Sequence, residues 1–182
     1  MTWIRTTLLV SVLIFTSCDI GEVPTASLDN PLHIEKAAQE GIDTPALVFF
    51  PDSVSASTGS SVSLEVYALN VDNLGMAYLK INYDNSRLSL SSINPGDFLK
   101  SSQNPIFLYE DNSETGIIDI YTSFLGTDSA SVSGTGNLAY LVFSTTTPGQ
   151  STLSYSAESE LSDPDDNPIV IKGFGEGVID AN

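Results

Sequence analysis

Carboxylates and serines, which can catalyse reactions, are numerous in this chain, but their spacing gives no recognisable catalytic site. The only histidine, His33, lies in an expected spacer, which leaves the many serines without their usual base. Asp111 and Glu114 form a carboxylate pair in an expected turn, but a chain with 23 acidic residues contains such pairs by number alone. No Gly-x-Ser-x-Gly elbow occurs in the sequence. We therefore expect that the protein is not an enzyme.

An acidic turn near the end of the chain is the main candidate for binding a cation. Asp163, Asp165 and Asn167 place side-chain oxygens at alternate positions, as some calcium loops do. An EF-hand loop needs glycine at its sixth position, where Pro168 stands, so that motif is excluded. A looser calcium site and a plain solvated turn both stay open. The sequence indicates no other metal site and no cofactor.

The first 18 residues have the pattern of an export signal. Arg5 is the only charged residue among them, and a largely apolar stretch of eight residues, Leu8 to Phe15, follows it. A helix that spans a bilayer needs about 20 apolar residues, so this stretch is too short to be one. Small residues at 16–17 then precede Cys18, the only cysteine, as at the end of a secretory signal.

The end of this leader resembles the lipobox of bacterial lipoproteins, in which cleavage leaves an N-terminal cysteine that carries lipid. The resemblance implies a signal peptide at residues 1–18 and lipidation of Cys18. It also implies an exported protein of the bacterial cell envelope, anchored to a membrane by lipid alone and facing the periplasm or the cell surface. The alternative is an ordinary signal peptide that is cut nearby.

The charge of the chain excludes two classes of partner. Acidic residues number 23 and basic residues 6, which gives a formal net charge of −17. Nucleic acid needs clustered lysine and arginine, and the basic residues here form no cluster in the sequence. The same charge opposes electrostatic binding to anionic lipid. Any contact with a membrane is therefore expected through the N-terminal lipid only.

Length and composition predict one folded domain behind a spacer. A hydrophobic fraction of 41% supports a core, and 182 residues suit a single domain with a leader. Residues 19–44 are expected to form a flexible spacer with a short helix, which Asn30 and Pro31 would begin and Gly41 would end. Residues 45–182 are expected to form the domain.

Alternating apolar and polar residues predict strands throughout that domain. The sets expected to face inward are Val62, Leu64 and Val66; Ala77, Leu79, Ile81 and Tyr83; and Ile118, Ile120, Thr122 and Phe124. The segment 138–143 is apolar throughout and predicts a central strand covered on both faces. Turn residues separate the runs, among them Gly96, which is expected to supply a positive φ. The pattern predicts an all-β sandwich.

Several motifs, taken in order, resemble a cohesin domain over residues 46–180. They are Ala46 to Phe49; Gly59 before Val62, Leu64 and Val66; Leu79 to Asp84 followed by Leu88; Asn94 to Leu99; Asn112 to Gly116 before Ile118 and Ile120; Gly136 to Ala139 with Phe143; Pro148-Gly149; and Gly173 to Ile179. The resemblance implies a nine-stranded jelly roll of the type shared with carbohydrate-binding modules. It also implies docking of a dockerin, a small calcium-loaded helical module on enzymes, to the outer face of one sheet.

Four residues are the candidate partner-binding set: Met76, Tyr78, Ile117 and Tyr121. Alternation with the core residues points all four outward, and exposed aromatic and apolar side chains favour a protein partner. Well-known cohesins carry a polar pair where Met76 and Tyr78 stand. Two alternatives stay open. A loop or the spacer covers these four residues, or they are scattered surface residues without a binding role.

Three functions are compatible with these features. The first is a non-catalytic, lipid-anchored exported module that docks a protein partner, with a dockerin-bearing polysaccharide-degrading enzyme as the class that the resemblance implies. The second is direct binding of polysaccharide by exposed tyrosines, drawn from Tyr67, Tyr78, Tyr121, Tyr140 and Tyr155. A flat set of rings on one outward face would favour it. The third is a surface lipoprotein with no dedicated ligand.

Overall fold

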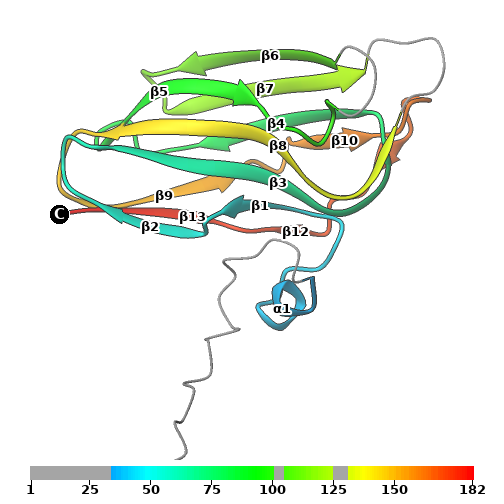
Figure 1. The fold of residues 1–182 in the computed structure, drawn as a ribbon, viewed down its shortest axis with the longest axis horizontal. Coiled ribbons are helices and arrows are strands. Elements are labelled where there is room, and N and C mark those ends of the chain that lie inside the picture. The colour runs from blue at the N-terminus through cyan, green and yellow to red at the C-terminus, as the bar shows by residue number, and fades with distance from the viewer. Residues whose placement is uncertain (1–33, 101–104, 125–130) are drawn as a thin grey trace, which may run out of the picture.

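Two β-sheets packed face to face make up the body of the protein (Figure 1). The computed structural model describes residues 34–100, 105–124 and 131–182. The elements are α1 (Ile34–Gln39), β1 (Ala46–Phe50), β2 (Ser53–Ala56), β3 (Ser61–Leu74), β4 (Met76–Asn82), β5 (Leu88–Pro95), β6 (Pro105–Asn112), β7 (Ile117–Phe124), β8 (Val132–Thr145), β9 (Gly149–Tyr155), β10 (Glu160–Ser162), β11 (Pro168–Ile169), β12 (Gly173–Phe174) and β13 (Gly177–Ala181).

One sheet has five strands in the order β12-β1-β3-β8-β5. Its two longest strands, β3 and β8, pair antiparallel along most of their 14 residues each. Their register shifts near the end of β3, where Asn70 and Asn73 adopt positive φ angles of 48° and 55°. Asparagine tolerates this left-handed conformation better than most residues do, so the strand bends there and still continues.

The second sheet has eight strands and is built around β4. β7 pairs along one edge of β4 and carries β6 on its own far side. The other edge of β4 pairs first with β10 and then with β9, so the turn between β9 and β10 interrupts this ladder opposite Lys80. Ser159 fills the interruption because its hydroxyl oxygen accepts a hydrogen bond from the Lys80 backbone N–H at 3.0 Å.

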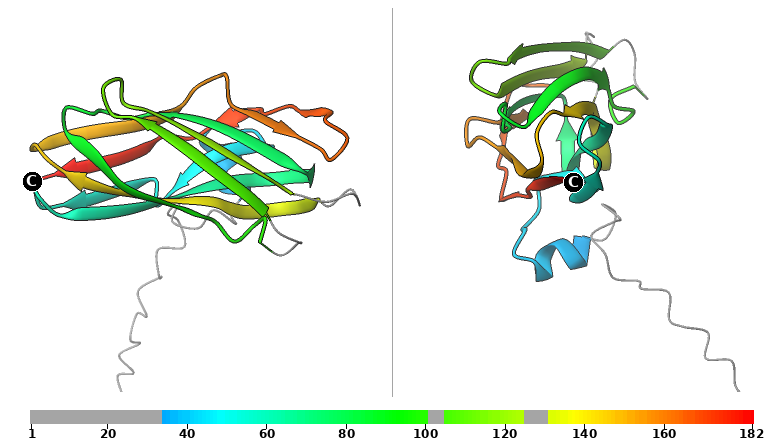
Figure 2. Two further views of the ribbon diagram at one scale, coloured as in Figure 1. Left: turned by 90° about the horizontal axis from the view of Figure 1, so that it is seen from above. Right: turned by 90° about the vertical axis from the view of Figure 1, so that its left-hand side faces the viewer.

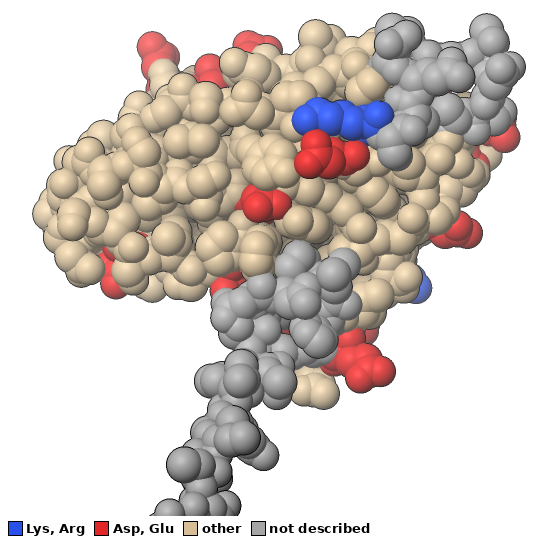
Figure 3. Space-filling view, viewed as in Figure 1, with Lys and Arg blue, Asp and Glu red and all other residues tan. Residues whose placement is uncertain are grey.

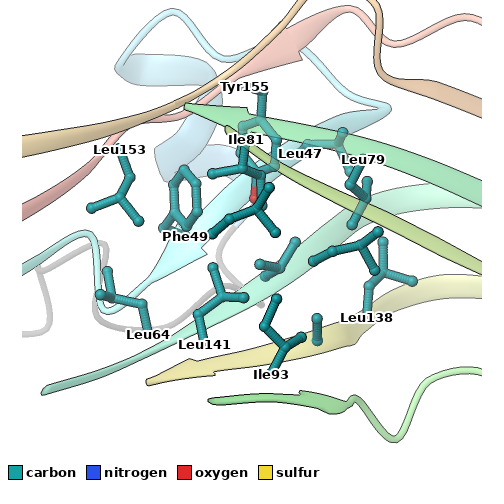
Figure 4. Close-up of a cluster of buried hydrophobic side chains, with 14 of the residues drawn as sticks. Leu47, Phe49, Leu64, Leu79, Ile81, Ile93, Leu138, Leu141, Leu153 and Tyr155 are labelled. Atoms are coloured by element: carbon teal, nitrogen blue, oxygen red, sulfur yellow. The ribbon is translucent and has the colours of Figure 1, made fainter. Parts of the chain in front are cut away.

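The core lies between the two sheets, as alternation predicted (Figure 4). Leu64, Leu79 and Ile81 are fully buried, and so are Ile118 and Ile120 of β7. Tyr83 directly follows β4 and continues its row of inward side chains, and its hydroxyl donates to Asp111 Oδ1 at 3.0 Å. Burial, together with this hydrogen bond, raises the pKa of Tyr83 to about 12. The all-β sandwich is therefore confirmed, with its short edge segments bringing the strands among the described residues to thirteen.

The helix α1 packs outside the sandwich, on β1 and β3 of the five-stranded sheet (Figures 1 and 2). Ala37 is buried against Val48 and Leu69 on the outer face of that sheet. Gly41 follows the helix with a φ of 82°, a conformation that favours glycine at a helix end. A six-residue helix is unstable alone, so this packing accounts for its place in the fold.

Two local predictions need correction. The segment 138–143 lies within β8 between β3 and β5, but Tyr140 and Val142 are half-exposed, so its outer face is not covered. The backbone of Gly96 does not have the predicted positive φ. Glycine is required because a Cβ there would overlap the backbone carbonyl of Asn137. A close approach of two chain segments, not a special backbone angle, therefore explains this glycine.

Candidate functional site

Two stacked tyrosines form the centre of the exposed face of the eight-stranded sheet. Tyr78 of β4 lies directly opposite Tyr121 of β7 across an antiparallel pair. Their ring centroids are 4.7 Å apart, and the rings are inclined by 19°. The Tyr78 hydroxyl donates to Asp119 Oδ1 at 2.6 Å. This hydrogen bond, with partial burial second, raises the pKa of Tyr78 well above its ordinary range.

Strand pairing extends these tyrosines into a row across four strands. Leu108 of β6 lies opposite Tyr121, and Glu160 of β10 lies opposite Tyr78. Leu108 is 62% exposed and Tyr121 is 47% exposed. We call Leu108, Tyr121, Tyr78 and Glu160 the tyrosine row. Apolar side chains of this exposure on a sheet face are suited to contact with a protein.

The other two predicted residues flank the tyrosine row at different distances. Met76 lies two residues from Tyr78 on the same face of β4 and lines a groove beside the sheet. Ile117 lies four residues from Tyr121 along β7, where its partners across the sheet are Asn82 and Asn112. The structure therefore brings Met76, Tyr78 and Tyr121 close together and leaves Ile117 apart. The partner-binding role of all four stays a prediction.

Charged residues beside the tyrosine row are mostly acidic. Glu110, Asp119 and Lys80 lie in successive strands, next to the row. The Lys80 ammonium contacts the carboxylate of Glu158 at 2.7 Å, and this contact raises the pKa of Lys80. The opposite face, over β5, β8 and β3, carries few charged side chains (Figure 3).

A groove of about 470 Å³ continues this face beyond β10. Its lining is mainly apolar and includes Met76, Leu161, Ile169, Ile171 and Phe174, with Glu160 and Asp166 as its acidic members. The short strands β10, β11 and β12 supply most of these residues. The groove is large enough for one or two apolar side chains of a partner.

The structure adds residues that the sequence did not single out. Leu108 and Asp119 belong to the same exposed face, and both could have been found by extending the alternation. Residues 105–112 were not predicted as a strand, although the apolar stretch 105–109 was a signal for one. No sequence pattern predicted the groove. It is formed mainly by three strands of two or three residues, which are too short to show a periodic pattern.

The five candidate tyrosines do not lie together on one outward face: Tyr67 and Tyr140 lie on the five-stranded sheet, and Tyr78 and Tyr121 on the other. Tyr155 is 8% exposed, stacks on Phe49 and donates its hydroxyl to the Val48 carbonyl, so it belongs to the core. Tyr140 lies on the outer face of the other sheet. The rings of Tyr78 and Tyr121 are stacked face to face, with centroids 4.7 Å apart. Two rings that lay side by side in one plane would have more widely separated centroids. This arrangement favours a protein partner over polysaccharide.

The acidic turn at 163–167 is closed by its own hydrogen bonds. Asp163 Oδ1 accepts from the backbone N–H groups of Asp165 and Asn167 at 3.0 and 2.8 Å. The Asn167 side-chain amide also donates to this carboxylate, and these bonds lower the pKa of Asp163. Within the three described segments, no group of three or more His, Cys, Asp or Glu side chains is arranged to hold a metal ion.

Two residues singled out in the sequence, Cys18 and His33, lie outside the described residues. The lipidation and signal-peptide predictions are therefore not tested by the structure. No helix in the described part of the chain is both long enough and apolar enough to cross a membrane.

A two-sheet jelly roll with an exposed aromatic face defines a class of binding modules. The sequence profile of the cohesin domain matches residues 47–172, which is more than half of the chain. The chain belongs to the cohesin family, whose members are non-catalytic binding modules. No curated protein matches the sequence.

Solved structures of cohesins have the same fold. A non-cellulosomal cohesin from the archaeon Archaeoglobus fulgidus is 24% identical with a TM-score of 0.62, covering 75% of this chain and 90% of that chain. The sixth cohesin of scaffoldin B from Acetivibrio cellulolyticus, in complex with a mutant dockerin, is 21% identical with a TM-score of 0.64, covering 75% and 98%. The cohesin of a type I cohesin–dockerin complex from Clostridium thermocellum is 18% identical with a TM-score of 0.61, covering 75% of this chain and 95% of that chain. The jelly-roll prediction is confirmed.

Proposed function

We propose that this protein is an exported, lipid-anchored cohesin module that docks a dockerin-type partner on the outer face of β4, β6, β7 and β10. The observation that carries the proposal is the tyrosine row, whose stacked pair lies on an exposed sheet face. Membership of the cohesin family, and solved cohesins in complex with dockerins, support the class of partner. The enzyme that would bear the dockerin is expected to degrade polysaccharide.

Docking would rest on burial of a few aromatic and apolar anchors. Tyr78 and Tyr121 are already held in place by their mutual stacking and by the bond to Asp119, so little side-chain freedom is lost on binding. Met76 and the groove offer a second apolar contact next to the pair. Glu110, Asp119 and Glu160 favour a partner surface that carries lysine or arginine near these anchors.

Lipid anchoring through Cys18 is part of the proposal. Each buried methylene group of an acyl chain contributes about 0.8 kcal/mol, and one chain alone holds a protein weakly. Two or more chains on Cys18 would hold the module firmly at a membrane surface. Replacing Cys18 by serine should then release the protein into the soluble fraction of the envelope, which fractionation and labelling with a fatty acid would detect.

Calorimetric titration with purified dockerin modules from the same organism, with calcium and then with chelator, tests the docking. We expect calcium-dependent binding and a loss of at least tenfold in affinity for Tyr78→Ala combined with Tyr121→Ala, because truncated anchors typically cost about 2 kcal/mol or more. Tyr140→Ala, on the opposite face, is the matched control and should bind normally. Full affinity in the double variant, or no dockerin bound by the parent protein, would overturn the proposal.

A further inference from the structure

The free edges of the two sheets differ in how they are protected against pairing with another chain. β11 and β12 have two residues each and β2 has four, which is too short to pair extensively. β5 has a register shift between Leu90 and Ser92 and ends at Pro95. Short length, irregularity and proline are devices that prevent edge-to-edge association. β6 has eight residues and pairs with β7 without a register shift.

The side chains of β6 are unusually apolar for an exposed edge. Leu108 is 62% exposed and the adjacent Tyr109 is 52% exposed, and successive residues of a strand point to opposite faces. Apolar surface therefore lies on both faces of the edge. β6 is the outermost strand at this end of the sandwich, and no described strand lies beyond it (Figures 1 and 2).

We propose that β6 pairs antiparallel with β6 of a second copy of this chain, which joins the two eight-stranded sheets. The distribution of charge along β6 makes the strand complementary to a second copy of itself. Residues 105–109 are uncharged and apolar, whereas Glu110 and Asp111 follow them. Antiparallel pairing across a two-fold axis sends the two acidic ends in opposite directions and overlaps the apolar halves. Parallel pairing would place like charges side by side, which is destabilising.

The two-fold pairing closes on itself and therefore gives a dimer, not a filament. It would also place the tyrosine rows of two copies on one continuous sheet face, since Leu108 belongs to both β6 and the row. The inference stands independently of dockerin binding. It requires only the free edge, its exposed apolar residues and the position of its acids.

Salt dependence distinguishes this association from one driven by ion pairs. Two copies of a chain with a net charge of −17 repel each other, and salt shortens the range of that repulsion to about 10 Å at 0.1 M. Pairing through an apolar edge should therefore strengthen as salt is added. Association through ion pairs would weaken under the same change.

Sedimentation equilibrium on residues 18–182 with Cys18→Ser, which keeps every described residue and removes the only thiol, tests the proposal. We expect a dimer between low micromolar and submillimolar concentration whose affinity rises with sodium chloride. Leu108→Glu should weaken it at least tenfold. Val170→Glu, at a residue that is 69% exposed on the segment between β11 and β12, is the matched control and should dimerise normally.

Single cysteines in the same thiol-free background locate the contact even if Leu108→Glu perturbs folding. Ile106→Cys mixed with Leu108→Cys should form a disulfide-linked dimer under mild oxidation, because antiparallel overlap of residues 105–109 places Leu108 opposite Ile106 of the second copy, within reach of such a bond. Val170→Cys should not. A monomer at all concentrations, a dimer unaffected by Leu108→Glu, or equal cross-linking at Val170→Cys would each overturn the proposal.

Discussion

Tyr78 connects the stacked aromatic pair of the proposed docking face to a charged residue of the same sheet. Its ring stacks on Tyr121, and its hydroxyl is bonded to the carboxylate of Asp119 at 2.6 Å. A carboxylate that accepts from a phenol stabilises the neutral phenol and opposes formation of the phenolate. The orientation of the ring therefore depends on a charged group that the exposed surface alone would not reveal.

We predict that Asp119→Asn lowers the pKa of Tyr78 back toward the ordinary tyrosine value of about 10. Because the folded pKa is raised above the unfolded value, this contribution to stability is present below about pH 10 and is lost as the pH rises further. Ultraviolet absorbance of the phenolate would follow the titration. Tyr78→Phe identifies the signal of Tyr78 by its loss, and an unchanged titration in Asp119→Asn would contradict the prediction.

The ladder beside β4 is interrupted at Lys80, next to the proposed docking face. The Lys80 backbone N–H donates a hydrogen bond to the Ser159 hydroxyl oxygen there, and the Lys80 carbonyl accepts from the Ser156 backbone N–H at 2.8 Å. Side-chain and turn bonds thus replace strand pairing at one residue. The turn also brings Glu158 to the Lys80 ammonium.

We predict that Ser159→Ala lowers the free energy of unfolding by about 1–3 kcal/mol, because it leaves a backbone donor without its partner. Hydrogen exchange should accelerate at the Lys80 amide, and denaturant titration would give the change in stability. Ser156→Ala is the control, since its hydroxyl accepts from the Glu158 N–H in an exposed turn. Equal effects of the two substitutions would contradict the proposed role of Ser159.

The long strands were predictable from the sequence because each buries one face. Burial of one face produces an alternation of apolar and polar residues with a period of two. Tyr78 and Tyr121 were predicted as outward residues for the same reason, but their contact depends on the register of β4 against β7, which alternation does not give. β6 and the groove were missed for different reasons. β6 has an apolar side chain on its exposed edge, Leu108, and the groove comes from strands of two or three residues.

At the scale of the whole molecule, charge is the dominant feature. A net charge of −17 destabilises the compact state through repulsion between carboxylates. Among the described residues, the ion pairs join Lys80 to Glu158, Arg87 to Asp84, and Lys100 to Asp97. Most acidic side chains therefore lie outside any ion pair in the described part of the fold.

We predict that moderate salt raises the melting temperature, because screening relieves more repulsion between carboxylates than it weakens exposed ion pairs. Scanning calorimetry from low to physiological ionic strength would measure the change. Sucrose at matched osmolality is a control for general solvent effects. A melting temperature that falls with salt would show that the few ion pairs outweigh the repulsion.

The helix α1 packs on the outer face of the five-stranded sheet, whereas the tyrosine row lies on the outer face of the other sheet. In the proposed anchored state, tension from the membrane would enter at α1 and tension from a docked partner would enter at β4 and β7. The two loads would meet across the core between the sheets. The sandwich would then act as a mechanical link, and its interlocked side chains would carry the pull.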